Sequence, residues 1–442
     1  MFPNRAYMLD VSRDRVPTMR TCYLIVDLLA RYRYNQFQLY TEHTFAYKNH
    51  REVWEEADPF TPQEIAKLQA YCEMQGIELV PNQNSFGHME RWLMLPRYNT
   101  LAKNPKGGVM TPWKTIKKYP TTLDPANPKA LELIDELFAE LLPNFHSQLF
   151  NIGCDETFEI TDVDEYLAFL LKIAQLARKN GKRPMFWGDI ILNHPEKIQE
   201  LPKDLIALDW GYESNHPFQK EAALFAESGL DFYVCPGTSS WRSLCGRIEN
   251  MRENLANAEK AGREFGAKGY MVTDWGDEGH WQPLAASLPG IVLGGNFAYS
   301  GAKSAKMDVE RELDSIMEAP LGGMLMKLGT LYMRGGALKA NCSELFNILR
   351  NDLGYSRHPA LTQSILDEIS GIAKGISVAA IKWADRNDWA KEIVYMANLV
   401  DAACHRRDEG RLRELRDEHG RIWRMRSREG GRIDSLSKLP RF

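Results

Sequence analysis

The chain has 442 residues, of which 44% are apolar and 26% are charged, and its formal net charge is −4. This length exceeds one ordinary small domain and suits a large barrel with an appended region. The weak negative charge gives no reason to expect a nucleic-acid partner or an anionic membrane surface, and no stretch reaches the ~18 apolar residues of a membrane span.

The seven cysteines are scattered along the chain and are never spaced as CxxC. We therefore expect neither a disulfide framework nor a structural zinc site, and no motif indicates a metal or another cofactor. The amino-terminal segment MFPNRAYMLD has neither the basic nor the apolar region of a signal peptide. With reduced thiols as the default, this predicts a cytoplasmic protein, and a removed leader is the alternative.

Strand-like and helix-like patterns alternate from the amino terminus onward. Thr61-Pro62-Gln63-Glu64 is a capping box with proline in the first turn, which predicts a helix that Gly76 ends. The connection over residues 84–127 is too long for an idle loop and is expected to help build a binding site. Short apolar runs bounded by turn residues predict eight strands, over residues 7–10, 36–40, 78–81, 149–152, 185–189, 206–210, 231–235 and 270–274.

Eight strands alternating with helices predict an α/β fold, a (β/α)8 TIM barrel, more readily than an open doubly wound sheet. No GxGxxG or GxxxxGK[ST] motif is present, which further weakens a dinucleotide or P-loop site. Strand signals stop beyond about residue 308. We therefore expect a catalytic barrel over residues 1–305 and a helical C-terminal region over residues 306–442 that packs on the barrel.

The stretch QLFNIGCDET, residues 148–157, ends a buried strand in two adjacent carboxylates, Asp155 and Glu156. Neighbours on an extended backbone point to opposite sides, so the pair can share one site only where the strand breaks into a loop. Gly153 allows that break. At the carboxyl end of a barrel strand, such a pair occupies the position where barrel enzymes do their chemistry.

Acidic and aromatic side chains also follow several other predicted strands. Aromatic rings stack on the C–H faces of a sugar, while carboxylates bind its hydroxyls and protonate the leaving oxygen. This favours a sugar site over a metal site built from His43, His88, Glu42 and Asp155, because no HxH or HExxH spacing is present. The strand-end residues are Asp10, Arg13, Glu42, His43, His88, Asp155, Glu156, Trp187, Asp189, Trp210, Trp241, Trp275, Asp277 and Glu278.

Several short motifs, in this order, resemble those of glycoside hydrolase family 20, the β-N-acetylhexosaminidases. The most specific is Ile152-Gly153-Cys154-Asp155-Glu156. The resemblance extends over most of residues 5–300. The individually weaker matches are Arg5 with residues 8–13, Tyr34-Asn35, Gly87-His88, Trp187-Gly188-Asp189 and a looser stretch over residues 423–435.

The resemblance implies an exo-acting hydrolase that releases terminal β-linked N-acetylglucosamine or N-acetylgalactosamine with retention. The substrate's 2-acetamido group would be the nucleophile and would form an oxazolinium intermediate. Glu156 would be the general acid and base, Asp155 would orient the acetamido group, and His88 and Glu42 would tune Glu156. The implied substrate-binding residues are Arg5, Trp187, Asp189, Trp210, Tyr233, Trp241, Trp275, Asp277 and Glu278.

The implied partner is an N-acetylhexosamine-terminated oligosaccharide or glycoconjugate, and a homodimer is compatible with it. The chain also departs from the family pattern. It lacks the usual N-terminal α/β domain, and its second strand ends in Tyr40-Thr41-Glu42-His43 where His-x-x-Asp is typical. The tyrosine expected after the seventh strand is missing, and two alternatives stay open: Tyr233 substitutes for it, or no residue does. These departures predict a divergent member.

Two other functions stay open at this point. A retaining β-glycosidase with a protein nucleophile would need a second carboxylate about 5–5.5 Å from Glu156, which Glu278 or Asp277 could supply. A non-catalytic sugar-binding barrel would keep the tryptophans but would not need Glu156.

Overall fold

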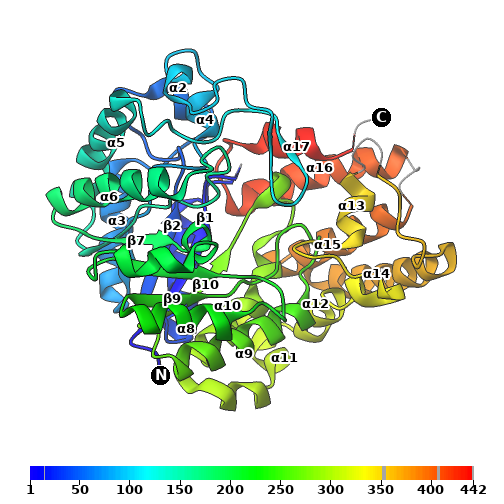
Figure 1. Cartoon of the computed structure of the whole chain (residues 1–442). Helices are drawn as coiled ribbons and strands as arrows, with labels where there is room; N and C mark the ends of the chain where they lie inside the picture. Colours follow the sequence, from blue (N-terminus) through cyan, green and yellow to red (C-terminus); the bar gives the residue numbers. More distant parts are fainter. Residues whose placement is uncertain (14, 351–354, 406–408, 441–442) are drawn as a thin grey trace.

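The computed structural model describes residues 1–13, 15–350, 355–405 and 409–440. Eight parallel strands form one sheet in the order β3-β2-β1-β10-β9-β8-β7-β6, and a parallel bridge between Asn82 and Asn151 joins its two ends. The predicted (β/α)8 barrel with a helical C-terminal extension is therefore confirmed (Figure 1). The barrel strands are β1 (Asn4–Asp10), β2 (Gln36–Tyr40), β3 (Glu78–Val80), β6 (Leu149–Asn151), β7 (Arg183–Trp187), β8 (Ile206–Trp210), β9 (Asp231–Cys235) and β10 (Gly269–Asp274).

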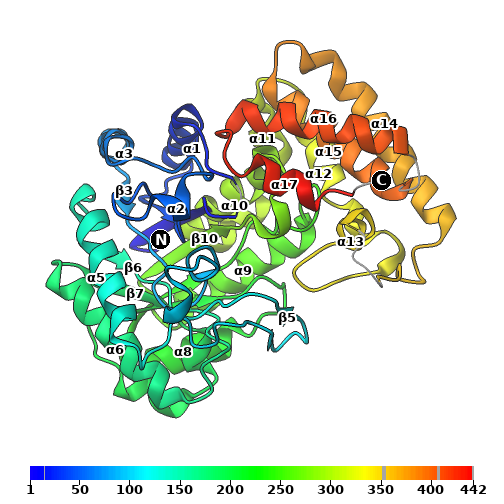
Figure 2. The same ribbon diagram turned by 90° about the horizontal axis from the view of Figure 1, so that it is seen from above.

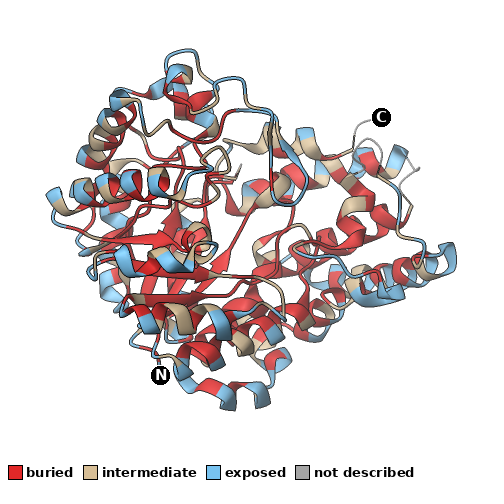
Figure 3. Ribbon diagram, viewed as in Figure 1, coloured by how far each residue is buried: buried red, intermediate tan, exposed pale blue. Residues whose placement is uncertain are grey.

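The barrel wall separates two apolar layers, because successive residues of a strand point to opposite faces. In β8, Ile206 and Leu208 belong to the interior cluster, which also holds Met8, Met185 and Tyr233. Ala207 belongs to the larger core between the strands and the helices. Colouring by burial shows the strands almost entirely buried, whereas the surrounding helices expose one face (Figure 3).

The helix predicted from the capping box at Thr61 is present among the helices that surround the barrel. In α3 (Pro62–Met74), Thr61 accepts a hydrogen bond from the backbone of Glu64 and the Glu64 side chain reaches back, which completes the predicted capping box. The predicted long connection holds a two-stranded hairpin, β4 (Val109–Met110) and β5 (Ile116–Lys117). The other main barrel helices are α1 (Met19–Arg31), α5 (Pro128–Leu141), α6 (Val163–Lys179), α8 (Phe218–Ser228), α9 (Ile248–Glu264) and α10 (Leu288–Ser300).

The C-terminal helices gather on one side of the barrel (Figure 2). The chain returns to the barrel after α16, where Thr18 N–H donates to the Arg426 carbonyl at 2.9 Å and Arg428 N–H donates to the Val16 carbonyl at 2.8 Å. None of the described helices combines the length and apolar composition needed to cross a membrane. These helices are α11 (Val309–Met317), α12 (Gly322–Leu328), α13 (Glu344–Arg350), α14 (Gln363–Ala384), α15 (Asp388–Cys404), α16 (Glu409–Arg426) and α17 (Arg432–Lys438).

A buried ion pair between two C-terminal helices, α15 and α16, is hydrogen-bonded to the barrel. Glu392 of α15 is fully buried, and its carboxylate accepts from Arg426 Nε at 2.6 Å and from Ala285 N–H at 2.7 Å. Removing one partner of a buried pair leaves the other charge without compensation. We therefore expect Glu392→Ala to lower the free energy of unfolding by about 3–5 kcal/mol, measured by urea denaturation. Glu55→Ala, which breaks the exposed Arg51–Glu55 pair, is the control and should cost less than about 1 kcal/mol. Equal effects would contradict the prediction.

Candidate active site

The acid pair lies in a tightly turned segment directly after β6. Gly153, Cys154 and Glu156 have positive φ angles of 72°, 75° and 50°. A Cβ on Gly153 would lie 2.3 Å from Asn84 Oδ1, so glycine is required there. Because the strand breaks at this point, the Asp155 and Glu156 carboxylates can turn toward the same neighbour. Such backbone strain clusters at functional sites.

That shared neighbour is His88. Its Nε2 atom lies 3.2 Å from Asp155 Oδ2 and 3.4 Å from Glu156 Oε2. Its Nδ1 atom lies 3.2 Å from Arg13 Nη2 and 3.8 Å from Glu42 Oε1. Burial lowers the pKa of His88, but the carboxylates of Asp155 and Glu156 outweigh burial and raise it to about 9. The imidazole is therefore charged at neutral pH.

Arg13 and Glu42 form the other side of this network. Arg13 Nη2 lies 3.3 Å from Glu42 Oε1, and Arg13 Nη1 lies 3.3 Å from Asp10 Oδ2. The guanidinium also lies over the rings of Tyr40 and Trp275, at 4.7 and 5.1 Å from their centroids. Burial raises the pKa of Glu42 to about 7, against the opposing charge of Arg13. The Arg13 side chain keeps 20% of its surface exposed, so it can also bind a ligand.

The surroundings of Glu156 favour its protonated form. Burial raises the pKa of Glu156, and the cations of His88 and Lys117 partly oppose this rise. The Glu156 backbone N–H donates to Asp189 Oδ2 at 3.1 Å. Burial, followed by the charge of Asp155, raises the pKa of Asp189 to about 8. A carboxyl group that keeps its proton closer to neutral pH is suited to general acid catalysis.

Aromatic side chains at or beyond the carboxyl ends of β7, β8, β9 and β10 form a wall. The rings of Trp187 and Trp275 lie 6.0 Å apart, and Tyr212 stacks on Trp210 at 5.2 Å. Trp241 meets the Tyr212 ring edge-on at 5.0 Å. Trp275 Nε1 donates to the Tyr212 hydroxyl oxygen at 2.8 Å. Because this oxygen accepts a hydrogen bond, the hydroxyl proton remains available for a ligand.

This combination of a strained acid pair, a charged histidine and an aromatic wall at the carboxyl ends of barrel strands agrees with the family comparison. The catalytic-domain model of glycosyl hydrolase family 20 matches residues 2–260, more than half of the chain. The chain belongs to glycosyl hydrolase family 20. The predicted family is therefore confirmed, and with it a glycoside hydrolase.

Relatives and solved structures agree with this assignment. Hexosaminidase D from Bos taurus is 21% identical over 304 residues, which cover 61% of this chain and 84% of the relative. A β-hexosaminidase from Akkermansia muciniphila is 25% identical over 233 residues, which cover 44% of this chain and only 46% of the relative. The crystal structure of Flavobacterium johnsoniae chitobiase matches with a TM-score of 0.58 and 16% identity, covering 99% of this chain and 78% of that one. At this identity the structural likeness shows the fold.

In this family 20 chain, most of the predicted site residues gather at the carboxyl ends of the barrel strands. Asp277 also reaches the network, with Oδ1 at 4.0 Å from Arg13 Nε. The gathered residues are Glu42, His88, Asp155, Glu156, Trp187, Asp189, Trp210, Trp241, Trp275 and Asp277.

Arg5 and Tyr233 lie elsewhere, so their predicted substrate contacts are corrected. The Arg5 guanidinium lies at the amino end of β1, where it donates to the carbonyls of Phe2, Pro3 and Arg33. The Tyr233 hydroxyl donates to Gln36 Oε1 at 3.2 Å, at the amino end of β2. Both side chains therefore lie at the end of the barrel opposite the acid pair.

Glu278 also has a different environment from the one predicted. It lies in the short 3-10 helix η4 (Asp277–Gly279), and its carboxylate forms an ion pair with Arg350 Nη1 at 2.5 Å. Burial raises the pKa of Glu278, but Arg350 and Arg242 outweigh burial and lower it. The carboxylate is thus engaged by cations outside the His88 network.

Tyr212 and Lys117 are site residues that the sequence patterns do not predict, and Arg13 is predicted only as a strand-end residue. Arg13 was recognised as a strand-end residue, but the motif match assigned its role to Arg5. Tyr212 follows Trp210 by two residues, the spacing that places side chains on one face of an extended chain, so that signal was present. Lys117 lies in the hairpin of the long connection, and its effect on Glu156 depends on how that hairpin folds back.

Glu42, His88 and Asp155 of the alternative metal set belong to the His88 network, but within the described residues they and His43 do not form a group of converging ligand atoms. Burial, and to a smaller extent the positive charge of Arg91, lowers the pKa of His43 to about 3. In the described part of the chain, the one group of histidine and carboxylate ligand atoms close enough to hold an ion lies elsewhere, at Asp209, His216 and Glu221.

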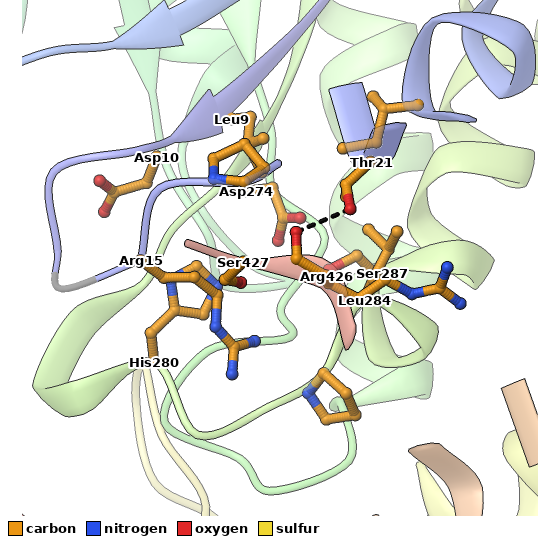
Figure 4. A pocket seen from close by; sticks show the side chains of 13 residues that line it. Leu9, Asp10, Arg15, Thr21, Asp274, His280, Leu284, Ser287, Arg426 and Ser427 are labelled. Carbon is orange, nitrogen blue, oxygen red and sulfur yellow. Dashed lines mark hydrogen bonds between the residues drawn. The ribbon is translucent and has the colours of Figure 1, made fainter. Parts of the chain in front are cut away.

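A small cavity of about 40 Å³ lies between β1, α1, β10 and the chain at Arg426 (Figure 4). The Thr21 hydroxyl donates to the Arg426 carbonyl across it at 2.7 Å. Burial lowers the pKa of Arg15, which lines the cavity, to about 10. A cavity of this volume has room for water. Its lining includes Asp10, which pairs with Arg13, but neither Asp155 nor Glu156.

His88 should set the basic limb of the pH–rate profile. Its positive charge stabilises the Glu156 carboxylate, so His88→Gln should raise the pKa of Glu156 further. Deprotonation of the general acid ends activity at high pH, and a higher pKa therefore moves this limb to higher pH. The measurement is kcat/KM against pH, with exposed His194→Gln as the control. An unmoved limb with only KM altered would show that His88 merely supports its own loop.

Proposed function

We propose that this protein is an exo-acting, retaining β-N-acetylhexosaminidase that uses the 2-acetamido group of its substrate as the nucleophile. The observation that carries the proposal is the state of Asp155. One carboxylate oxygen contacts His88, while Oδ1 is buried and accepts no hydrogen bond within the described structure. A buried oxygen of this kind needs a donor, and the N–H of an acetamido group supplies one.

Each remaining part of the substrate has a partner in the site. Glu156 protonates the glycosidic oxygen and afterwards takes the proton of the attacking water. The Tyr212 hydroxyl donates to the acetamido carbonyl, in place of the tyrosine expected after the seventh strand. The tryptophan wall holds the acetamido group beneath the ring, which keeps its oxygen close to the anomeric carbon. Arg13 binds the sugar hydroxyls.

A protein nucleophile has less support. Glu278, the first alternative, is engaged by Arg350. Asp189 uses Oδ2 to hold the Glu156 backbone. Relatives named hexosaminidase support an N-acetylhexosamine-terminated glycan as the substrate. A homodimer and a cytoplasmic location stay predictions.

A panel of nitrophenyl β-glycosides tests the proposal. The panel pairs the gluco and galacto configurations with either a 2-acetamido or a 2-hydroxyl group. We expect turnover of one or both 2-acetamido sugars, retention at the anomeric carbon by proton NMR, and almost no turnover of the 2-hydroxyl sugars. Equal turnover of 2-hydroxyl sugars would favour the protein-nucleophile glycosidase, and no turnover of any glycan would favour a binding barrel.

A further inference from the structure

A second polar cluster lies on the outer surface of the barrel wall, behind the aromatic wall. Along β8, Leu208 and Trp210 face the barrel interior, so Asp209 between them points outward toward α8. Glu221 lies in the first turns of α8, and His216 lies in the loop that connects β8 to α8. The sequence contains no metal motif over these residues, and the sequence analysis did not identify them.

The ligand atoms of the three side chains converge. One oxygen or nitrogen atom from each of Asp209, His216 and Glu221 lies within 4.8 Å of the others. His216 Nε2 and Glu221 Oε2 are 2.7 Å apart, yet neither makes a hydrogen bond of acceptable geometry, and both atoms are buried. Asp209 is fully buried, and neither of its carboxylate oxygens accepts a hydrogen bond in the described residues.

Within the described residues, His216 is the one cationic group of this arrangement, and it compensates a carboxylate only when it is protonated. In the described part of the chain, neither Asp209 nor Glu221 forms an ion pair with an arginine or lysine. Burying carboxylates without hydrogen bonds or cations costs several kcal/mol. A proton shared by the two carboxyl groups, a protonated His216 or a metal ion must therefore offset the charge.

We propose that Asp209, His216 and Glu221 bind one divalent transition-metal ion, with Zn²⁺ as the first choice. One imidazole nitrogen and two carboxylate oxygens are a ligand set that Zn²⁺ accepts, at bond lengths of about 2.0–2.2 Å. A metal accounts for all three side chains of the cluster, whereas a protonated His216 paired with Glu221 leaves both carboxylate oxygens of Asp209 without a partner. Binding requires His216 Nε2 and Glu221 Oε2, now 2.7 Å apart, to separate slightly, because two tetrahedral ligands with bonds of about 2.0–2.2 Å lie more than about 3 Å apart.

The position of His216 is fixed before any ion binds. A Cβ at residue 211 would lie 2.1–2.3 Å from atoms of the imidazole ring, so Gly211 is what lets the ring pack against the backbone. The loop itself is held by three asparagines of α9. Asn250 Nδ2 donates to the Tyr212 carbonyl at 2.7 Å, Asn254 Nδ2 donates to the Gly211 carbonyl at 2.9 Å, and Asn257 Nδ2 donates to the His216 carbonyl at 2.7 Å.

The site has a structural role because of its position. Asp209 is adjacent to Trp210, and the loop between Asp209 and His216 carries Tyr212, whose ring stacks on Trp210. An ion that ties β8, this loop and α8 together holds Trp210 and Tyr212 in place. The ion lies on the opposite side of the strand from the acid pair and takes no part in the chemistry.

Metal binding by the full chain tests the proposal directly. The protein is purified without an affinity tag, treated with a chelator, dialysed, and titrated with Co²⁺ while its visible absorption is recorded. We expect one equivalent of Co²⁺ per chain, displaced by Zn²⁺, and a Tm that rises by several degrees when Zn²⁺ is in large excess over its Kd. Glu156→Gln should bind the same single equivalent, which separates this site from the acid pair.

Ligand variants identify the residues. His216→Gln and Glu221→Gln should weaken Co²⁺ binding by about 100-fold or more. The double variant His194→Gln/Glu196→Gln, which removes an exposed histidine–carboxylate pair, should bind normally. The proposal is overturned if the unaltered chain binds no stoichiometric Co²⁺, or if His216→Gln and Glu221→Gln bind it as tightly as the unaltered chain. Suppose that the unaltered chain binds no metal and that Asp209→Asn has a higher free energy of unfolding than the unaltered chain. The cluster would then be held by a shared proton instead.

Discussion

Glu156→Gln is expected to slow hydrolysis of an N-acetylhexosamine disaccharide by about 10²–10⁴-fold, because the amide cannot transfer a proton to the glycosidic oxygen. A sugar leaving group needs this proton, whereas a nitrophenolate leaves readily without it. The loss should therefore be much larger for the disaccharide than for a nitrophenyl glycoside. The measurement is kcat for both substrates with the same enzyme preparations.

Glu165→Gln is the matched control, because it makes the same chemical change away from the site. Glu165 lies in α6 and forms an ion pair with Lys103. Its activity should be close to that of the unaltered enzyme. If Glu156→Gln cleaved the disaccharide at a near-normal rate, Glu156 could not be the general acid. In that case Asp189, whose pKa burial and Asp155 raise to about 8, would be the next carboxyl group to test.

Asp155→Asn should reduce kcat severely, by about 10²-fold or more, while changing ground-state binding much less. In the proposed mechanism, positive charge develops on the acetamido group only as the oxazolinium ion forms, and the Asp155 carboxylate stabilises that charge. The measurement compares kcat with the Kd of the product sugar. A thiazoline mimic of the intermediate should bind the unaltered enzyme far more tightly than the product and should lose most of this advantage in Asp155→Asn.

The control for Asp155→Asn is Asp162→Asn, at the amino-terminal cap of α6, where asparagine caps a helix as well as aspartate does. A different outcome is informative too. Good turnover of 2-hydroxyl glycosides by the unaltered enzyme, with a 2-fluoro glycoside trapped on a carboxylate, would assign the nucleophile to the protein. Mapping the labelled peptide would then show whether Asp189, Asp277 or Glu278 carries it.

Local patterns were enough to predict the architecture. The eight apolar runs became the eight barrel strands, because each is bounded by turn residues and alternates with an amphipathic helix. The capping box predicted at Thr61 and Glu64 is present, with both of its hydrogen bonds. The acid pair was also visible, since two adjacent carboxylates that follow a buried strand and a glycine are typical of a barrel active site. These features depend on neighbours within one turn or one strand.

Which residues of a strand contact the substrate was predicted less well than the strands themselves. Arg5 and Asp10 belong to the same strand, but at about 3.3 Å per residue they lie roughly 16 Å apart, at opposite ends of the barrel. The motif match contained both Arg5 and Arg13, and only the direction of β1 decides that Arg13 reaches the acids. Tyr233 is excluded because its hydroxyl, from the middle of β9, reaches Gln36 at the amino end of β2. Tyr212 belongs to the site because it lies just past the carboxyl end of β8.

The sequence by itself determined the barrel, its helical extension, the family and the position of the acid pair, because these follow from local hydrophobic periodicity and one specific motif. The motif match implied that His88 and Glu42 act on Glu156, but only the tertiary structure showed that Arg13 joins them. Arg13, Glu42, His88 and Glu156 come from different strand ends, and barrel closure brings them within hydrogen-bonding distance. Asp209, His216 and Glu221 have no recognisable spacing and converge only because α8 packs back on the outer face of β8. Side-chain distances of a few ångströms across the fold depend on how distant segments pack, and local sequence does not encode them.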